Sequence, residues 1–270
     1  MRFHTHEALI LEVRDLQDTD RIVAFLTRER GHKRGVARGA RRRHSRFAGQ
    51  LQPLAKVRVH WGEKEGRELV RISGADLLRP PHGLGGDLEG LLLGSVLADH
   101  MLRFAQEDEP SELYFRLLDS TLEALAAGVD RDLAVRYFEA WVLRIAGIFP
   151  APRGCPQCGE SFGAEGAVLP PAGEALLCPR CAGGTAGAGD RPSAVAAAPG
   201  GLAVPVPVLA FLVAVGRLSL PELAAQGGAE PAVLRRAEEL ASRVRRAFLG
   251  HELKSYDVMR RTLAEVAGAG

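Results

Sequence analysis

Apolar and polar residues alternate along the first 80 positions of the chain. In AKVRVHW, the residues Val57, Val59 and Trp61 share one side of an extended strand. The segments ALILEV, RIVAFLT and ELVRISGADLL continue this pattern, and glycines separate them as they do at turns or bulges. The alternation therefore predicts a small, strongly curved antiparallel sheet or barrel with Trp61 in its core.

The period changes after RPPHGLGGD at residues 79–87, a cluster of residues that break regular structure. Leucines then recur at helical spacing in three successive segments, the second of which follows Ser111. Helical spacing returns after residue 202 and is clearest in PAVLRRAEELASRVRRAFLG, with Pro231 near its start and Gly250 just past its end. We therefore predict an α+β multidomain protein. Its parts are a barrel at 1–80, a helical domain formed by 81–150 and 202–270, and an insert with a linker at 151–201.

The predicted insert contains all four cysteines, in two C-x2-C pairs that nineteen residues separate. Each pair directs two thiolates toward one point, and two pairs complete the tetrahedral four-sulfur shell that Zn²⁺ prefers. This shell has no position for a catalytic water, so we expect one structural zinc ion. A redox dithiol and a metal-free finger are weaker alternatives, because no βαβ unit surrounds the pairs and the spacing fits zinc. The predicted ligands are Cys155, Cys158, Cys178 and Cys181.

The positive charge of the chain is concentrated near its start. The net charge is +2, but residues 1–80 hold 18 Lys or Arg against 10 Asp or Glu, which leaves −6 on the rest. Nine of these cations lie between Arg28 and Arg46, with Glu29 as the one acid. Basic residues at this density displace counterions from a phosphate backbone, although a charge run can also be a solvated surface. The candidate phosphate contacts are Lys33, Arg34, Arg38, Arg41, Arg42, Arg43 and Arg46.

Two further features bear on nucleic-acid binding. Phe47 lies within the basic stretch and is the best candidate for stacking on a base, but we expect it to be buried. A second basic group lies on and after the last long helix, where Glu238 and Glu239 can pair with it. A DNA track and a self-paired helix face are both open for this group. It consists of Arg235, Arg236, Arg243, Arg245, Arg246 and Lys254.

Other classes of protein lack their motifs in this sequence. No G-x-x-x-x-G-K-[ST] loop occurs, so we expect no nucleotide cofactor, and the scattered histidines disfavour a zinc hydrolase or nuclease. No secretory signal is visible, and the longest apolar run, 202–215, has 14 residues and contains two prolines, too short to span a bilayer. We therefore expect a soluble, cytoplasmic protein that is not an enzyme. The Gly/Ala/Pro-rich stretch 183–201 is predicted to be a mobile linker or loop.

Three motifs stand in order along the chain: RGVARGARRRHSRF within the basic stretch, the double C-x2-C, and LKS at Leu253–Ser255. Together with EALILEVRDLQDTDRIVAFLT, they resemble the RecO family of recombination mediators over nearly the whole chain. The resemblance implies an N-terminal OB-fold followed by an α-helical domain with a four-cysteine zinc-binding insert. The family's insert is often more compact than the stretch 183–201, and some relatives lack the cysteines.

The resemblance also implies a non-catalytic role in DNA repair. A protein of this kind binds single- and double-stranded DNA, anneals complementary strands, and acts at the nucleoid. With RecR it helps to load RecA onto single strands coated by SSB, whose C-terminal tail is a further partner. The basic stretch then faces DNA, the four cysteines hold zinc, and Lys254 in LKS is an additional contact. An RNA-binding adaptor with a structural zinc knuckle is the alternative, because phosphate contacts serve both nucleic acids.

Overall fold

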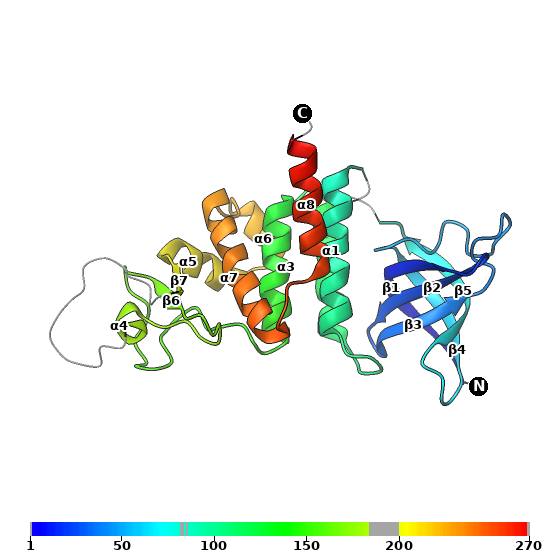
Figure 1. Ribbon diagram of the computed structural model, residues 1–270, viewed down its shortest axis with the longest axis horizontal. Coiled ribbons are helices and arrows are strands. Elements are labelled where there is room, and N and C mark those ends of the chain that lie inside the picture. The colour runs from blue at the N-terminus through cyan, green and yellow to red at the C-terminus, as the bar shows by residue number, and fades with distance from the viewer. Residues whose placement is uncertain (1, 82–83, 85, 184–199, 269–270) are drawn as a thin grey trace. The chain divides into compact units, whose positions relative to one another are not determined.

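The predicted barrel is present in the computed structural model of the chain, which describes residues 2–81, 84, 86–183 and 200–268 (Figure 1). Five strands close in the order β1-β2-β3-β5-β4. Only β3 and β5 pair in parallel; the other neighbours are antiparallel. This closed five-stranded barrel is OB-like, as predicted. The strands are β1 (Arg2–Leu16), β2 (Asp20–Thr27), β3 (Gly31–Ala37), β4 (Lys56–Glu63) and β5 (Val70–Arg79).

Alternate residues of the strands fill the barrel. Trp61 is fully buried, as predicted, and its ring centroid lies 5.4 Å from that of Phe25. The loop between β3 and β4, residues 38–55, adds Phe47 and Leu51 to the same core. Phe47 is 3% exposed, which confirms the expected burial. The loop is therefore fastened to the barrel by apolar side chains.

The first of two compact units combines the barrel with three helices from distant parts of the sequence. The helices are α1 (Leu88–Phe104), α2 (Glu112–Ala126) and α8 (Lys254–Gly268). Lys56 and Arg79 of the barrel both pair with Asp119 of α2, the former at 2.9 Å. The backbone N–H of Ser255 donates to the carboxylate of Asp99 on α1 at 3.2 Å, which ties the start of α8 to this unit.

The second compact unit spans Val129–Glu252 and contains the cysteine-bearing insert. Trp141 and Arg144 of its first helix donate hydrogen bonds to the carbonyls of Val215 and Leu212, at 3.1 and 2.6 Å. These carbonyls lie in the last turn of α5, where the helix itself supplies no partners. The elements are α3 (Arg131–Ile145), β6 (Ala167–Leu169), α4 (Pro179–Ala182), β7 (Leu202–Val204), α5 (Val206–Val215), α6 (Leu220–Ala225) and α7 (Pro231–Leu249).

The helix predicted from Pro231 and Gly250 has both expected ends. Pro231 is the first residue of α7, and Gly250 follows its last residue with φ +77°, the left-handed conformation that glycine adopts without strain. The three helices predicted after the barrel are also present, as α1, α2 and α3.

The compact units divide the chain differently from the predicted domains. The barrel ends at Arg79, close to the predicted break, but the first unit continues to Gly128 and includes the chain from Leu253 onward. Contacts of α1, α2 and α8 within that unit account for this division. The predicted linker at 183–201 lies mostly outside the described residues.

Candidate nucleic-acid interface and metal centre

The residues from Arg38 to Arg46 form an exposed segment between β3 and β4, which we call the basic arm. All five of its arginines are exposed. Within the part of the chain that the structure describes, four of them form no salt bridge; these are Arg38, Arg42, Arg43 and Arg46. The arm therefore presents guanidinium groups that are free to meet phosphates.

The start of the arm is tied to the turn between β1 and β2. The backbone N–H of Gly39 donates to Asp20 Oδ1 at 2.8 Å, and that of Arg41 donates to the carbonyl of Thr19 at 2.9 Å. Gly39 has φ +69°, a conformation that favours glycine. The guanidinium of Arg41 lies 3.5 Å from Asp15. Arg41 thus braces the arm besides adding to its charge.

The other end of the arm is anchored by Phe47. Its ring lies in the barrel core, and the Arg46 guanidinium lies over it at 5.1 Å from the ring centroid. The hydroxyl of Ser45 accepts the Phe47 N–H at 3.2 Å. The backbone of the arm is therefore held at both ends before any ligand binds.

Arg34 and Lys33 point to opposite sides of β3. Arg34 is exposed, whereas the side chain of Lys33 is 6% exposed. The Lys33 ammonium lies 2.8 Å from Glu63 Oε1 and also pairs with Asp108. A buried ammonium with two carboxylate partners is not free for a phosphate, so the structure corrects the interpretation of Lys33 as a phosphate contact.

Glu63 is the centre of the cluster of charges around Lys33. Burial raises the pKa of its carboxyl, but hydrogen bonds from Lys33 and Trp61, with the charges of Lys33 and His4, outweigh burial and lower the pKa to about 2. The Arg30 guanidinium lies 3.2 Å from its second oxygen. Glu63 is therefore ionised at neutral pH and stabilises the cations around it.

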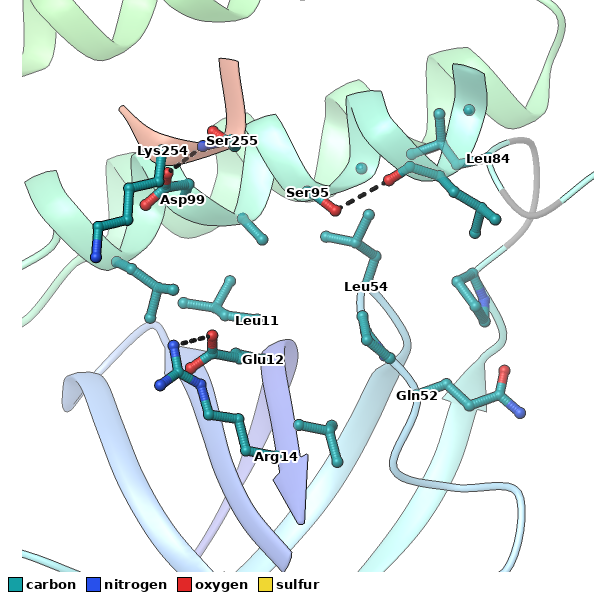
Figure 2. Close-up of a pocket in the computed structure, with 18 of the residues that line it drawn as sticks. Leu11, Glu12, Arg14, Gln52, Leu54, Leu84, Ser95, Asp99, Lys254 and Ser255 are labelled. Carbon is teal, nitrogen blue, oxygen red and sulfur yellow. Dashed lines mark hydrogen bonds and ion pairs between the residues drawn. The ribbon is translucent and has the colours of Figure 1, made fainter. Parts of the chain in front are cut away.

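A cavity of about 710 Å³ lies within the first unit, between α1 and the outer surface of the barrel (Figure 2). Leu11, Leu54 and Leu84 contribute apolar surface to it. Gly94 on α1 packs closely against Leu54 in the cavity wall: a Cβ added at Gly94 would lie 2.9 Å from the side chain of Leu54.

Lys254 lies at the rim of this cavity, on α8 (Figure 2). Its ammonium is exposed and forms no salt bridge within the described residues. Arg14 lines the same rim and pairs with Glu12 at 2.7 Å, and Arg103 lies 3.9 Å from Asp99. Lys254 is thus part of a rim of three cations, of which it is the unpaired member.

The four cysteine sulfurs lie within 4.8 Å of one another. All four thiols are free, and the sulfurs of Cys158 and Cys178 are 3.8 Å apart. A tetrahedral shell with Zn–S bonds of about 2.3 Å has edges of about 3.8 Å, so the donor set fits a metal ion and is compatible with zinc.

The backbone of the two C-x2-C turns supports this arrangement. The N–H of Gly159 donates to the carbonyl of Cys155 at 2.8 Å and closes the first turn. Burial raises the pKa of the Cys155 thiol, but backbone N–H groups of Cys178, Cys158 and Gln157 outweigh burial and lower the pKa to about 6. Donors aimed at this sulfur favour the thiolate, which is the form that binds metals.

The second basic group is paired in part: Arg236, Arg245 and Arg246 form salt bridges, whereas Arg235, Arg243 and Lys254 form none within the described residues. Arg245 is 1% exposed and pairs with Glu139 and Glu252, the latter at 2.7 Å. On the exposed side, Arg236 pairs with Glu239 at 2.7 Å. Arg236–Glu239 lies within α7, whereas both partners of Arg245 lie outside it, so a DNA track and a self-paired helix face both stay open for this group.

Two family models match the chain in sequence. The model described as Recombination protein O N terminal matches residues 1–81, and the model described as Recombination protein O C terminal matches residues 85–200. The chain belongs to the RecO family.

Curated members of the RecO family align with most of the chain. A DNA repair protein RecO from Anaeromyxobacter sp. (strain Fw109-5) is 34% identical over 260 residues, covering 96% of this chain and 94% of the relative. Another, from Anaeromyxobacter dehalogenans (strain 2CP-C), is 32% identical with the same coverage of both chains. A third, from Geobacter metallireducens, is 35% identical over 70% of this chain and 76% of the relative. Membership of RecO identifies this chain as a protein of DNA repair and recombination.

The site has residues that sequence reasoning did not find. Asp20, Glu63 and Asp108 hold the arm or the Lys33 cluster in place, and they are acids in or near a basic surface. One signal was present: by strict alternation along β3, Lys33 shares its side of the strand with the buried Ala37.

In the described residues, no helix is long and apolar enough to cross a membrane.

Proposed function

We propose that this RecO family protein is a non-catalytic recombination mediator that binds single- and double-stranded DNA through the basic arm. The observation that carries the proposal is a set of exposed arginines, most of which form no salt bridge within the described residues, on a segment that is held by contacts at both ends. Guanidiniums form bidentate contacts with phosphate, and donors held in place before binding lose less entropy when DNA binds. Arg34 on β3 extends this surface. The proposed set is Arg34, Arg38, Arg41, Arg42, Arg43 and Arg46.

Strand annealing follows from the same surface. Two complementary strands repel each other through their phosphates, and a protein that neutralises phosphates lowers this repulsion. Phe47, beside the arm, is buried and not available for stacking on a base, so the contacts that we propose are with the phosphate backbone. Such binding is independent of sequence, as annealing of any complementary pair requires.

The partners in this proposal are RecR, RecA and SSB. The protein acts with RecR to load RecA onto SSB-coated single strands, and it contacts the SSB C-terminal tail. It needs no nucleotide cofactor, and it acts in the cytoplasm at the nucleoid. Membership of the RecO family supports this part of the proposal.

We assign one structural zinc ion to Cys155, Cys158, Cys178 and Cys181. The sulfur separations and the N–H donors around Cys155 support this assignment. Zinc held by four thiolates contributes folding energy and offers no open position for a water nucleophile. The ion would stabilise the insert of the second unit.

Lys254 is proposed as a weaker DNA contact. Its exposed ammonium, beside Arg14 and Arg103 at the cavity rim, supports this role. Binding there would add to the charge that the basic arm supplies.

The proposal is tested by replacing Arg42, Arg43 and Arg46 together with alanine. For single strands, each phosphate contact contributes about −0.7 to the slope of log K against log salt. Loss of three contacts reduces the steepness by about 2, for every oligonucleotide sequence. The affinity for a labelled oligothymidine is measured over about 50 to 200 mM salt.

A control removes equal charge elsewhere, at the exposed residues Arg116, Arg153 and Arg217. This variant is expected to keep the wild-type slope. An unchanged slope in the arm variant would contradict the assignment of the arm. Competition by an RNA of the same sequence separates the two nucleic acids: preference for RNA would favour the adaptor alternative.

A further inference from the structure

Asp20 introduces a negative charge into the proposed DNA-binding surface. It is the first residue of β2, and its carboxylate faces the basic arm across the turn. A carboxylate repels phosphate, so the electrostatics of DNA binding alone would disfavour an acid here. The contacts of Asp20 indicate what it does instead.

Two donors converge on a single oxygen of Asp20. Oδ1 accepts the backbone N–H of Gly39 at 2.8 Å and the hydroxyl of Thr19 at 3.0 Å. The N–H of Gly39 is the largest cause of a lowered pKa for this carboxyl, and the charges of Arg38 and Arg42 act in the same direction. Asp20 is therefore ionised where the arm leaves β3.

The hydrogen bond to Gly39 fixes the point at which the chain turns into the arm. Gly39 stands next to Arg38, and its left-handed conformation sets the direction of the residues that follow. Without the Asp20 acceptor, the arm keeps the N–H···O bond between Arg41 and Thr19 and the anchor at Phe47, but it loses this side-chain brace. The arginines would then occupy a wider range of positions, and DNA would have to order them on binding.

We propose that Asp20 is a positioning residue, which strengthens DNA binding by holding the basic arm although its charge opposes DNA. This inference rests on the proposed function of the arm. Position and charge can be separated because both donors use one oxygen. The amide oxygen of asparagine can accept both hydrogen bonds without the negative charge, whereas alanine removes the acceptor and the charge together.

The experiment compares Asp20→Ala, Asp20→Asn and Asp18→Ala in the full chain, using oligothymidine affinity at low salt. Asp18 is an exposed acid of the same turn and makes no salt bridge or side-chain hydrogen bond within the described residues, so it is the matched control for charge. Removing one acid near the site is expected to tighten binding about twofold to threefold for Asp20→Asn and Asp18→Ala. Asp20→Ala is expected to weaken binding about fivefold, because ordering the released arm costs more than the charge removal gains.

The sign of the Asp20→Ala effect decides the inference. If Asp20→Ala tightens binding as much as Asp20→Asn does, Asp20 acts by charge alone and the positioning role is wrong. Thermal unfolding of each variant shows whether the fold is intact. If Asp20→Ala unfolds, Asp20→Asn still tests the inference. Weaker DNA binding by the folded Asp20→Asn variant would also overturn the positioning role. If the arm variant of the previous section binds normally, the proposed function fails instead.

Discussion

We expect Lys33 to stabilise the fold through its ion pairs and not to contact DNA. The substitution Lys33→Met tests this expectation. Methionine retains the aliphatic length but removes the charge that faces Glu63 and Asp108. Loss of one partner from a fully buried ion pair costs roughly 3–5 kcal/mol. The Lys33 side chain is 6% exposed, but those of Glu63 and Asp108 are 21% and 56% exposed and remain partly hydrated. We therefore expect a loss of about 2–3 kcal/mol in the free energy of unfolding.

The pKa of Glu63 gives an independent magnitude. A carboxyl whose pKa falls from 4.5 to about 2 on folding gains roughly 3 kcal/mol, and Lys33 contributes to this gain through both its hydrogen bond and its charge. For a unit of this size, about 2–3 kcal/mol lowers the unfolding temperature by roughly 5–10 °C. The stabilisation is complete above about pH 4.5, where the unfolded carboxyl is ionised too, and it disappears as the pH falls toward 2.

The assay is thermal unfolding at neutral pH, together with oligothymidine affinity of the folded protein. Arg34→Ala is the matched control, because Arg34 is the next residue along β3 and is exposed. We expect Lys33→Met to lower the unfolding temperature and leave DNA affinity nearly unchanged, and Arg34→Ala to do the reverse. A Lys33→Met variant of normal stability and reduced affinity would show that Lys33 contacts DNA and that its ion pairs do not stabilise the fold.

Three other changes have defined outcomes. Cys155→Ser should abolish stoichiometric zinc, measured by elemental analysis, and should lower thermal stability more than the DNA affinity of the folded fraction; a metal-free variant of normal stability would contradict this. Lys254→Ala should reduce the salt slope by about 0.7, less than the arm variant does, and an unchanged slope would exclude Lys254 as a contact. Arg245→Met should destabilise the second unit by roughly 3 kcal/mol in chemical unfolding, because Glu139, whose pKa burial raises, would lose a charged partner; normal stability would show that this pair is dispensable.

The sequence predicted those parts of the fold that depend on local pattern. Strand alternation placed Trp61 inside the barrel, and Pro231 and Gly250 marked the ends of α7. The C-x2-C spacing predicted that four sulfurs would meet, and they do. For the strand and the helix, the physical cause lies within a few residues of its effect.

The sequence did not predict features that depend on distant partners. The cost of burying the Lys33 ammonium is offset by its contact with Asp108, 75 residues away in the sequence. The start of α8 is tied to the first unit by the hydrogen bond between Ser255 and Asp99, 156 residues apart. The arginines of the basic arm also differ in their contacts, which the charge run alone does not show. Arg41 pairs with Asp15 and helps to hold the arm, whereas Arg43 is unpaired within the described chain. A count of positive charges cannot distinguish these roles, because they depend on which acids the fold brings close.

Backbone amide hydrogen exchange with and without oligothymidine shows where on the chain DNA binds. It is therefore the most direct test of DNA binding by the basic arm. We expect DNA to slow exchange in the basic arm, at residues 38–46, and near Arg34 on β3, and to leave α7 unchanged. Slower exchange confined to α7 or to the cysteine-bearing insert, with no change in the arm, would contradict it.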